Sequence, residues 1–259
     1  MNIEVNTMAE MKSRNETPDI LFWVGSAGSF DDRAKKITRS FVKILNHAKI
    51  NFAVLGVEES ASGDVAKRAG NEFLFQMQAL MNIEILNGYE VKKIVTTCPH
   101  DYNTLKNEYK SLGGIYDVYH HTEYIYKLYN EKKIELSPNL NNISITYHDP
   151  CYLGRGNGIF DAPRELLKLI GVKLTEMKRS RKSSFCCGAG GAQMFKEPEK
   201  GNQDININRT TEAIKTKASK IATSCSFCNT MLSDGVKNLA EGTIDVMDIC
   251  ELIVLSKNL

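Results

Sequence analysis

The strongest constraint on the fold is an internal repeat, because four short blocks of sequence occur twice in the same order. The second copy follows the first by 125 to 128 residues, and the paired blocks are Ser26 with Cys151, Ala61–Gly63 with Cys186–Gly188, Lys93–Cys98 with Lys220–Cys225, and Asp117–Val118 with Asp245–Val246. Four blocks at nearly one offset indicate a duplicated domain. We therefore expect a polar N-terminal extension at residues 1–17, a first domain at 18–138 and a second at 139–259, with a linker at 138–142.

Within each copy, apolar runs that predict strands alternate with stretches whose apolar residues recur at helical spacing. Strands are predicted at residues 20–24, 51–55, 94–98, 118–119, 143–147, 172–177, 221–223 and 245–247. Helices are predicted at residues 32–47, 72–88, 122–130, 162–170 and 208–217, with a last helix after the final strand. This alternation predicts an α/β protein, with two tandem duplicated α/β domains, mainly parallel sheets and Rossmann- or flavodoxin-like layering.

Composition and charge exclude several classes of protein. The 33 Lys and Arg residues nearly balance the 31 Asp and Glu residues, so the net charge of +2 argues against nucleic acid as the main partner. The sequence has no run of about 18 apolar residues, so no transmembrane segment is predicted. The first 18 residues lack the apolar stretch of a secretory signal, so we expect a cytoplasmic protein whose thiols stay reduced.

Seven cysteines are the unusual feature of the composition: Cys98, Cys151, Cys186, Cys187, Cys225, Cys228 and Cys250. An odd number at uneven spacing is a poor disulfide framework. Loops beyond the carboxyl ends of strands in an open α/β sheet converge on one crevice. Cys151 and Cys225 each follow a predicted strand of the second copy, and the adjacent pair Cys186–Cys187 opens a glycine-rich loop. Three loops are therefore expected to bring five thiols together.

Soft thiolate ligands select zinc, Cu(I) or iron–sulfur clusters. A structural zinc and a cubane [4Fe–4S] cluster each take four cysteines, so the fifth thiol needs an explanation. One explanation is an opened cluster in which some thiolates bridge irons, and another is four ligands with one thiol free for redox chemistry. The loop that begins at Gly188 contains three glycines, and its backbone N–H groups can approach the sulfurs closely.

Three motifs resemble those of the cysteine-rich CCG domain: His148–Arg155, Cys186–Gly191 and Cys225-x-x-Cys228. That domain occurs in the B subunit of heterodisulfide reductase and in the iron–sulfur subunits of glycolate oxidase, anaerobic glycerol-3-phosphate dehydrogenase and the lactate-utilisation system. The resemblance extends from about residue 18 to residue 255. It implies one [4Fe–4S] cluster, noncubane in the heterodisulfide reductase branch, whose ligands here are Cys151, Cys186, Cys187, Cys225 and Cys228.

The resemblance also implies an iron–sulfur oxidoreductase similar to the B subunit of heterodisulfide reductase, acting as an electron-transfer subunit of a multi-subunit redox complex. The expected partners are ferredoxin-type or flavoprotein subunits, and the expected acceptor is a disulfide, a quinone or a similar molecule. The chain itself has no Gly-x-Gly-x-x-Gly or Cys-x-x-Cys-x-x-Cys motif for such cofactors. Peripheral membrane association would come through the partners. The alternatives are a non-redox scaffold with structural zinc and a metal-free dithiol reductase, both of which use Cys225 and Cys228.

The first copy has lost most of the cysteine motif. Ser26 stands in place of the first cysteine, Ala61 and Ser62 in place of the adjacent pair, and Cys98 and Asp101 in place of Cys-x-x-Cys. Hydroxyls and carboxylates are harder ligands than thiolates, so we predict a degenerate site and a cluster in the second copy only. We expect Cys98 to be a core thiol, with the alternative that it lines a substrate pocket together with His100.

Other residues of interest surround these motifs. His148 and Gly188 are candidates to hydrogen-bond the ligands of the centre, although a structural role for His148 is equally compatible with its position. We expect structural roles for His120, His121 and Cys250. The basic residues Arg155, Lys178, Arg179, Arg181 and Lys182 predict either a solvated face, a docking face for an acidic partner, or charge compensation for a thiolate-ligated cluster.

Overall fold

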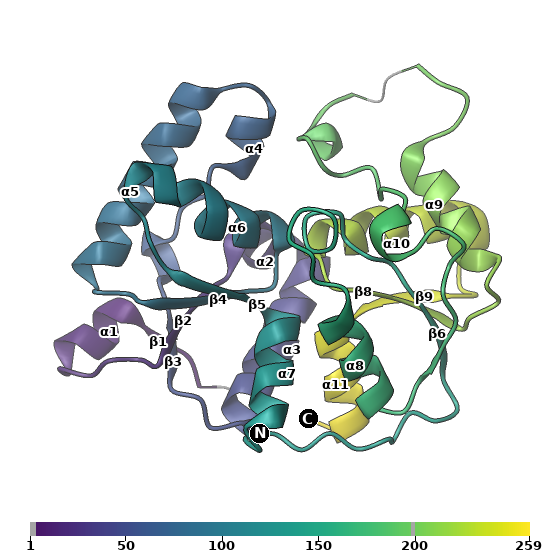
Figure 1. Ribbon diagram of the computed structural model, residues 1–259, viewed down its shortest axis with the longest axis horizontal. Coiled ribbons are helices and arrows are strands. Elements are labelled where there is room, and N and C mark those ends of the chain that lie inside the picture. Colours follow the sequence, from purple (N-terminus) through teal and green to yellow (C-terminus); the bar gives the residue numbers. More distant parts are fainter. Residues whose placement is uncertain (1–3, 198–199) are drawn as a thin grey trace. The chain divides into compact units, whose positions relative to one another are not determined.

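The fold is known from a computed structural model, which describes residues 4–197 and 200–259 (Figure 1). The chain divides near residue 134 into two compact units. The described part of each unit contains one sheet, and every strand pair within each sheet is parallel. This finding confirms the α/β class and the parallel sheets expected from the sequence.

The first unit has a sheet with the strand order β1-β3-β2-β4-β5. Its strands are β1 (Asn6–Thr7), β2 (Ile20–Trp23), β3 (Phe52–Val54), β4 (Lys93–Thr96) and β5 (Asp117–His120). Its α-helices are α1 (Met8–Ser13), α2 (Gly25–Phe30), α3 (Asp32–His47), α4 (Asp64–Arg68), α5 (Glu72–Gly88), α6 (Pro99–Asn103) and α7 (His121–Asn130). Helices α5 and α6 lie on one side of the sheet and α3 and α7 on the other (Figure 1). Both faces are therefore covered, which explains why β2 is apolar and buried at every position.

The second unit repeats this topology. Its sheet has the order β7-β6-β8-β9, which matches β3-β2-β4-β5 of the first unit strand for strand. The strands are β6 (Ser144–Tyr147), β7 (Lys173–Leu174), β8 (Lys220–Thr223) and β9 (Asp245–Asp248), and the α-helices are α8 (Asp161–Leu169), α9 (Ile205–Ile214), α10 (Ser226–Ala240) and α11 (Ile249–Lys257). Figure 1 shows α9 and α10 on one side of this sheet and α8 and α11 on the other. The shared strand order agrees with the sequence repeat.

The last helix of each unit begins with the same type of cap. Asp248 caps α11 by accepting the Cys250 N–H at 2.9 Å, and Glu251 accepts the Asp248 N–H in return. His120 and Glu123 form the corresponding capping box at the start of α7. His120 therefore has a structural role, as expected, and Cys250 is buried in α11.

Residues 4–17 do not form a polar extension, and this expectation was wrong. β1 pairs with β3 at the sheet edge, and α1 follows it. The Thr7 hydroxyl accepts the Glu10 N–H at 3.2 Å while the Glu10 carboxylate accepts the Thr7 N–H at 2.7 Å, a capping box that starts α1. Met8 and Met11 are buried, so α1 packs one apolar side against the unit. The polar composition of the segment hid this amphipathic spacing.

Met11→Ala tests this assignment. Because Met11 is only 2% exposed, we expect the substitution to lower the free energy of unfolding by about 2–5 kcal/mol. The exposed Lys36→Ala in α3 of the same unit is the control and should change it by about 0.5 kcal/mol or less. Chemical denaturation of the full chain measures both values, and a neutral effect of Met11→Ala would show that α1 does not belong to the folded unit.

Candidate metal centre

The five cysteines of the second copy converge at the carboxyl edge of its sheet. Cys151 follows β6, and Cys225 follows β8 as the N-cap of α10, where its Sγ accepts the Cys228 N–H at 3.5 Å. Cys186 and Cys187 come from the loop between β7 and α9. The parallel arrangement of β6 and β8 places the ends of both strands at the same edge, as the sequence predicted.

The five side chains form one continuous set of sulfur contacts. Hydrogen bonds link Cys151 to Cys186, Cys186 to Cys187, Cys187 to Cys228, and Cys228 to Cys225. Cys187, Cys225 and Cys228 are buried together with Ala189, against the partly buried Met194, Phe227 and Met231. Cys151 and Cys186 are half-buried. The centre therefore has an apolar interior and a more open side.

Hydrogen bonds between the thiols shift their pKa values in opposite directions. The pKa of Cys186 is lowered to about 2, because the thiols of Cys151 and Cys187 donate to its sulfur and the Gly188 N–H donates to it at 3.3 Å. The pKa values of Cys151 and Cys187 are raised, first because each donates to Cys186 and then because of burial. The pKa of Cys228 is also raised well above its usual value by its bonds to Cys187 and Cys225. These hydrogen bonds therefore favour negative charge on Cys186 over Cys151, Cys187 and Cys228.

A buried ionic framework holds the loops that carry the cysteines. Arg164 of α8 binds both carboxylate oxygens of Asp149, at 2.7 and 2.9 Å, and also binds Glu176 at 2.6 Å. The Ser184 hydroxyl donates to the Asp149 carbonyl at 3.1 Å. Asp149 thereby joins the segment before Cys151 to the segment before Cys186. A planar guanidinium suits this paired recognition of carboxylates.

His148 and Arg209 lie beside the thiols. His148 is 1% exposed, and its Nδ1 accepts a hydrogen bond from Arg209 Nε at 3.0 Å. One ring nitrogen of His148 and the Sγ atoms of Cys187 and Cys228 all lie within 4.8 Å of one another. Burial lowers the pKa of His148 well below its usual value, and the charge of Arg209 lowers it further. His148 is therefore a neutral group close to the sulfurs, and its partner Arg209 belongs to no motif recognised in the sequence.

The donor set fits a soft metal or an iron–sulfur group. Five thiols converge, and the buried His148 Nε2 has no hydrogen-bond partner among the described residues. Gly188 adopts a φ of +97°, and a Cβ there would lie 3.2 Å from Ile205 Cβ and 3.3 Å from Met231 Cε. Glycine lets this backbone turn and approach Cys186 closely. These features are expected of a cradle built around thiolate-bound metal.

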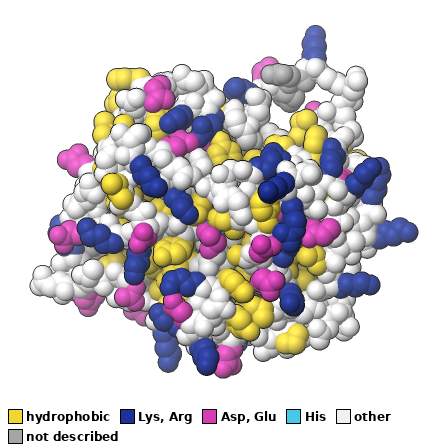
Figure 2. All heavy atoms as spheres, viewed as in Figure 1, with side chains coloured by type: hydrophobic (Ala, Val, Ile, Leu, Met, Phe, Trp, Pro, Cys, Tyr) yellow, Lys and Arg dark blue, Asp and Glu magenta, His cyan; other side chains and the backbone are white. Residues whose placement is uncertain are grey.

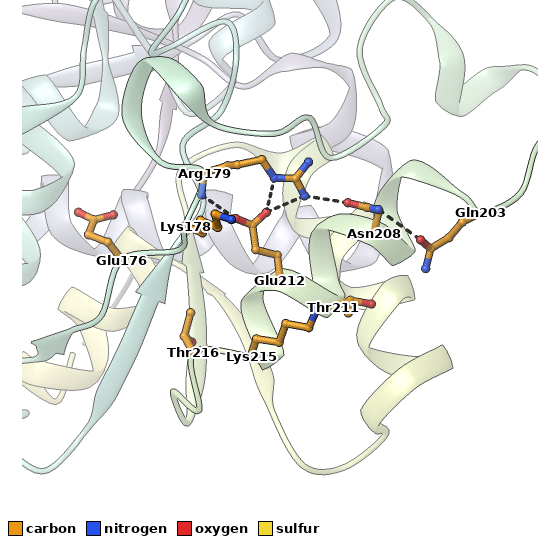
Figure 3. Close-up of a pocket in the computed structure, with 9 residues that line it drawn as sticks. All are labelled: Glu176, Lys178, Arg179, Gln203, Asn208, Thr211, Glu212, Lys215 and Thr216. Atoms are coloured by element: carbon orange, nitrogen blue, oxygen red, sulfur yellow. Dashed lines mark hydrogen bonds and ion pairs between the residues drawn. The ribbon is translucent and has the colours of Figure 1, made fainter.

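Two of the five basic residues near Cys186 pair with acidic side chains. Arg179 binds Glu212 through its backbone N–H at 2.6 Å and through Nε at 2.8 Å, and its Nη2 donates to Asn208 (Figure 3). Arg181 pairs with Asp161 at 2.8 Å. Over the face drawn in Figure 2, Lys and Arg side chains are interspersed with Asp and Glu. Arg179 and Arg181, two of the five residues considered for docking, therefore have acidic partners within this unit.

The pocket drawn in Figure 3 has a volume of about 720 Å³, and none of the cysteines lines it. Glu176, Arg179 and Glu212 lie on its wall, and these residues also belong to the ionic framework around the centre. The cavity is therefore separate from the thiol cluster itself.

In the first copy, the residues at the equivalent positions are also linked by hydrogen bonds, but oxygen atoms replace most of the sulfur atoms. Ser62 and Asp101 occupy the positions of Cys187 and Cys228 in the repeat, and the Ser62 hydroxyl donates to Asp101 Oδ1 at 2.5 Å. Cys98 also hydrogen-bonds to Asp101. Ser26 and Ala61 are exposed and lie outside this arrangement. The space that thiols line in the second unit is filled here by a hydrogen-bonded carboxyl group.

Two further acids that no sequence motif indicated lie near this group, the half-buried Glu59 and the buried Asp64. The Glu59 carboxylate accepts the backbone N–H groups of Val24 and Gly25 at 3.0 and 2.6 Å. Asp64 binds His100 Nδ1 at 3.0 Å, so His100 has a buried ionic partner. Burial raises the pKa of Glu59 to about 8 and that of Asp101 to about 6.

The fold and the thiol cluster define a class of protein, a duplicated α/β protein with five clustered thiols in its second unit. The sequence model of the CCG cysteine-rich domain matches residues 20–106 and 145–233. The chain therefore belongs to the CCG cysteine-rich domain family. This match confirms the resemblance that the three sequence motifs indicated.

The curated relatives are longer proteins, each of which contains a segment similar to this chain. The chain is 49% identical over 98% of its length to the probable iron-sulfur-binding oxidoreductase FadF of Bacillus subtilis, and 44% identical over 91% to the EtfAB:quinone oxidoreductase of Syntrophomonas wolfei. It is 34% identical over 91% to the D subunit of the dihydromethanophenazine:CoB–CoM heterodisulfide reductase of Methanosarcina barkeri. The chain spans 36%, 34% and 58% of the lengths of these relatives. The heterodisulfide reductase relative is thus a D subunit, whereas the sequence motifs suggested similarity to the B subunit.

A solved structure shares the fold. The crystal structure of a hypothetical protein from Helicobacter pylori matches 94% of this chain and 50% of its own, with a TM-score of 0.60 and 10% sequence identity. At this identity the match shows the fold alone.

Within residues 4–197 and 200–259, no helix has the length and apolar character needed to cross a bilayer.

Asp101→Asn tests the charge state of the first copy. The pKa of Asp101 rises from 3.8 to about 6 on folding, chiefly because of burial, so the folded state holds its proton more tightly than the unfolded state. The contribution of Asp101 to stability is therefore lost as the pH rises from about 4 to about 6, and it amounts to about 3 kcal/mol or less. We expect Asp101→Asn to remove this part of the pH dependence of the free energy of unfolding.

Denaturant titrations of the metal-free chain between pH 4 and pH 8 measure the effect. The exposed Asp117→Asn substitution removes an equal charge from the same unit and is the control. If Asp101→Asn and Asp117→Asn keep the same slope of stability against pH, Asp101 is not the buried acid described here.

Proposed function

We propose that this chain is the iron–sulfur electron-transfer part of a multi-subunit oxidoreductase. Its second unit would hold one [4Fe–4S] cluster through Cys151, Cys186, Cys187, Cys225 and Cys228. The observation that carries the proposal is the convergence of these five thiols, from three loops, on one buried centre. The names of the relatives from Bacillus subtilis and Syntrophomonas wolfei, which are oxidoreductases, support a redox role.

The protein's own residues supply an environment for electron transfer. The cluster would provide one-electron redox chemistry when bound. The apolar side chains of Met194, Phe227 and Met231 would exclude water from its buried side, and the backbone N–H of Gly188 would hydrogen-bond a ligand sulfur. The Asp149–Arg164 framework would hold the loops in one arrangement in both redox states. The five thiols favour the noncubane type of cluster, because a cubane has places for only four.

The names of the relatives suggest which partners and which acceptor to expect. We infer that electrons pass between a ferredoxin-type or flavoprotein partner and a quinone, a disulfide or a similar acceptor. The relative from Syntrophomonas wolfei is named for EtfAB and quinone, and the one from Methanosarcina barkeri for a heterodisulfide. We place the protein in the cytoplasm, and partner subunits would bring it to a membrane. One relative is described as a probable membrane-anchored ferredoxin.

The proposal places no cluster in the first unit. Ser62 and Asp101 offer oxygen where Cys187 and Cys228 offer sulfur, and their mutual hydrogen bond fills the space. Oxygen ligands suit hard cations rather than iron–sulfur clusters. The chain should therefore bind half as much iron as a protein with two intact copies.

Anaerobic reconstitution of the full chain with iron and sulfide tests the proposal. We expect about four irons per chain, with an absorption and electron paramagnetic resonance signal of a [4Fe–4S] centre. Cys225→Ser should abolish most of the iron binding, because it removes a buried ligand. Cys98→Ser, at the equivalent position of the first copy, is the matched control and should retain the wild-type iron content.

Two results would contradict the proposal. A colourless protein that binds one zinc and no iron after this treatment would indicate a structural scaffold. About eight irons per chain, with iron loss in Cys98→Ser, would show that the first copy also holds a cluster.

A further inference from the structure

The bond between Arg209 and His148 fixes where the histidine carries its proton. A guanidinium group has only donors, so the Arg209 Nε–H must donate and His148 Nδ1 must accept, at 3.0 Å. A ring nitrogen that accepts a hydrogen bond carries no proton. The proton of the neutral ring therefore lies on Nε2, and a doubly protonated ring would place an N–H against the N–H of Arg209.

Arg209 is itself held firmly in this orientation. It is 0% exposed, its Nη1 donates to the Arg179 carbonyl at 2.9 Å and to Glu212 at 3.0 Å, and its Nη2 donates to the Ser184 hydroxyl at 3.3 Å. Glu212, which also binds Arg179 in Figure 3, anchors the far side of the guanidinium. These bonds leave Nε directed at the imidazole of His148. The tautomer is thus imposed by a rigid neighbour.

The Nε2–H of His148 is a buried donor that needs an acceptor. It has no hydrogen-bond partner within the part of the chain that the structure describes. A ring nitrogen lies within 4.8 Å of the Sγ atoms of Cys187 and Cys228. A buried donor without an acceptor costs about 1–3 kcal/mol. The sulfur atoms of the centre lie beside the ring and can serve as this acceptor.

We propose that His148 donates a hydrogen bond from Nε2 to a sulfur atom of the bound cluster or its thiolate ligands, and is not itself a ligand. Ligation through Nε2 would require the proton to move to Nδ1, where it would face Arg209. Arg209 therefore acts as a positioning residue that excludes His148 from the ligand set. The inference rests on the proposed function in one respect, namely that the acceptor belongs to an iron–sulfur centre.

A donor to sulfur has a predictable electronic effect. Reduction makes the centre more negative, so a hydrogen bond to its sulfur stabilises the reduced state more than the oxidised state. Hydrogen bonds to sulfur are among the factors that set cluster potentials. His148 should therefore raise the midpoint potential of the centre, and loss of its N–H should lower it.

The tautomer of His148 can be measured in the metal-free, reduced wild-type chain, so this test does not depend on the folding of a variant. Two-bond ¹⁵N–¹H correlation spectra of chain labelled at its five histidines distinguish the two neutral tautomers. We expect the Nε2–H form for His148. Arg209→Met should mix in the Nδ1–H form, whereas Arg179→Met should not, because Arg179 shares Glu212 but does not contact His148. An Nδ1–H tautomer in the wild type would overturn the proposal.

The role of the His148 Nε2–H group is tested by measuring the iron content and midpoint potential of the reconstituted chain. His148→Phe should keep the wild-type iron content but shift the midpoint potential to a lower value, and His148→Gln, whose amide can replace Nε2–H, should restore part of the shift. Loss of iron in both variants to the level of Cys187→Ser would identify a ligand and overturn the proposal, as would an unchanged potential in His148→Phe. If the wild type takes up no iron, the proposed function fails, and the tautomer still decides the assignment of Arg209 and His148.

Discussion

The parallel direction of the strands is the constraint on which the rest of the structure depends. Because β6 and β8 run the same way, Cys151 and Cys225 emerge at one edge of the sheet although 73 residues separate them. The loop that carries Cys186 and Cys187 begins after β7, the next strand of the same sheet. The strands thus determine where each loop begins. Only the conformation of the last few residues of each loop remains to be set by other interactions.

Buried ion pairs hold these loop residues in place. Asp149 lies between His148 and Cys151, and Arg164 neutralises it with two hydrogen bonds while the side chains of both residues are less than 9% exposed. A buried ion pair gives little net stability, but breaking it is costly, so it holds one loop arrangement against alternatives. Arg209 likewise pairs with Glu212 and hydrogen-bonds to His148 and Ser184. The centre is therefore rigid on its protein side, which suits a group that must change charge with little movement.

Much of the fold and of the thiol set could be predicted from the sequence, because both depend on local patterns. Buried parallel strands such as β2 are continuous apolar runs, and the five cysteines follow strand ends or glycine-rich turns. Long-range polar partners could not be predicted. Arg209 lies 61 residues from His148 and resembles any helical arginine in sequence. Likewise, the amphipathic α1 was hidden within a polar segment, and β7 shortened to two residues where a six-residue strand was expected.

The two units fill equivalent positions with different side-chain chemistry. In the second unit, Cys187, Cys228 and Cys225 are linked in that order, and in the first Ser62, Asp101 and Cys98 are linked in the same order. The first set satisfies its polar atoms internally, since an unpaired buried hydroxyl or carboxyl would be costly. The cost of this solution is a buried acid whose pKa is raised to about 6, beside a second acid with a pKa of about 8. The polar residues of the first site are therefore satisfied by hydrogen bonds to one another. The second site retains five thiols and a His148 Nε2 without a partner among the described residues, as expected of a site that binds a further group.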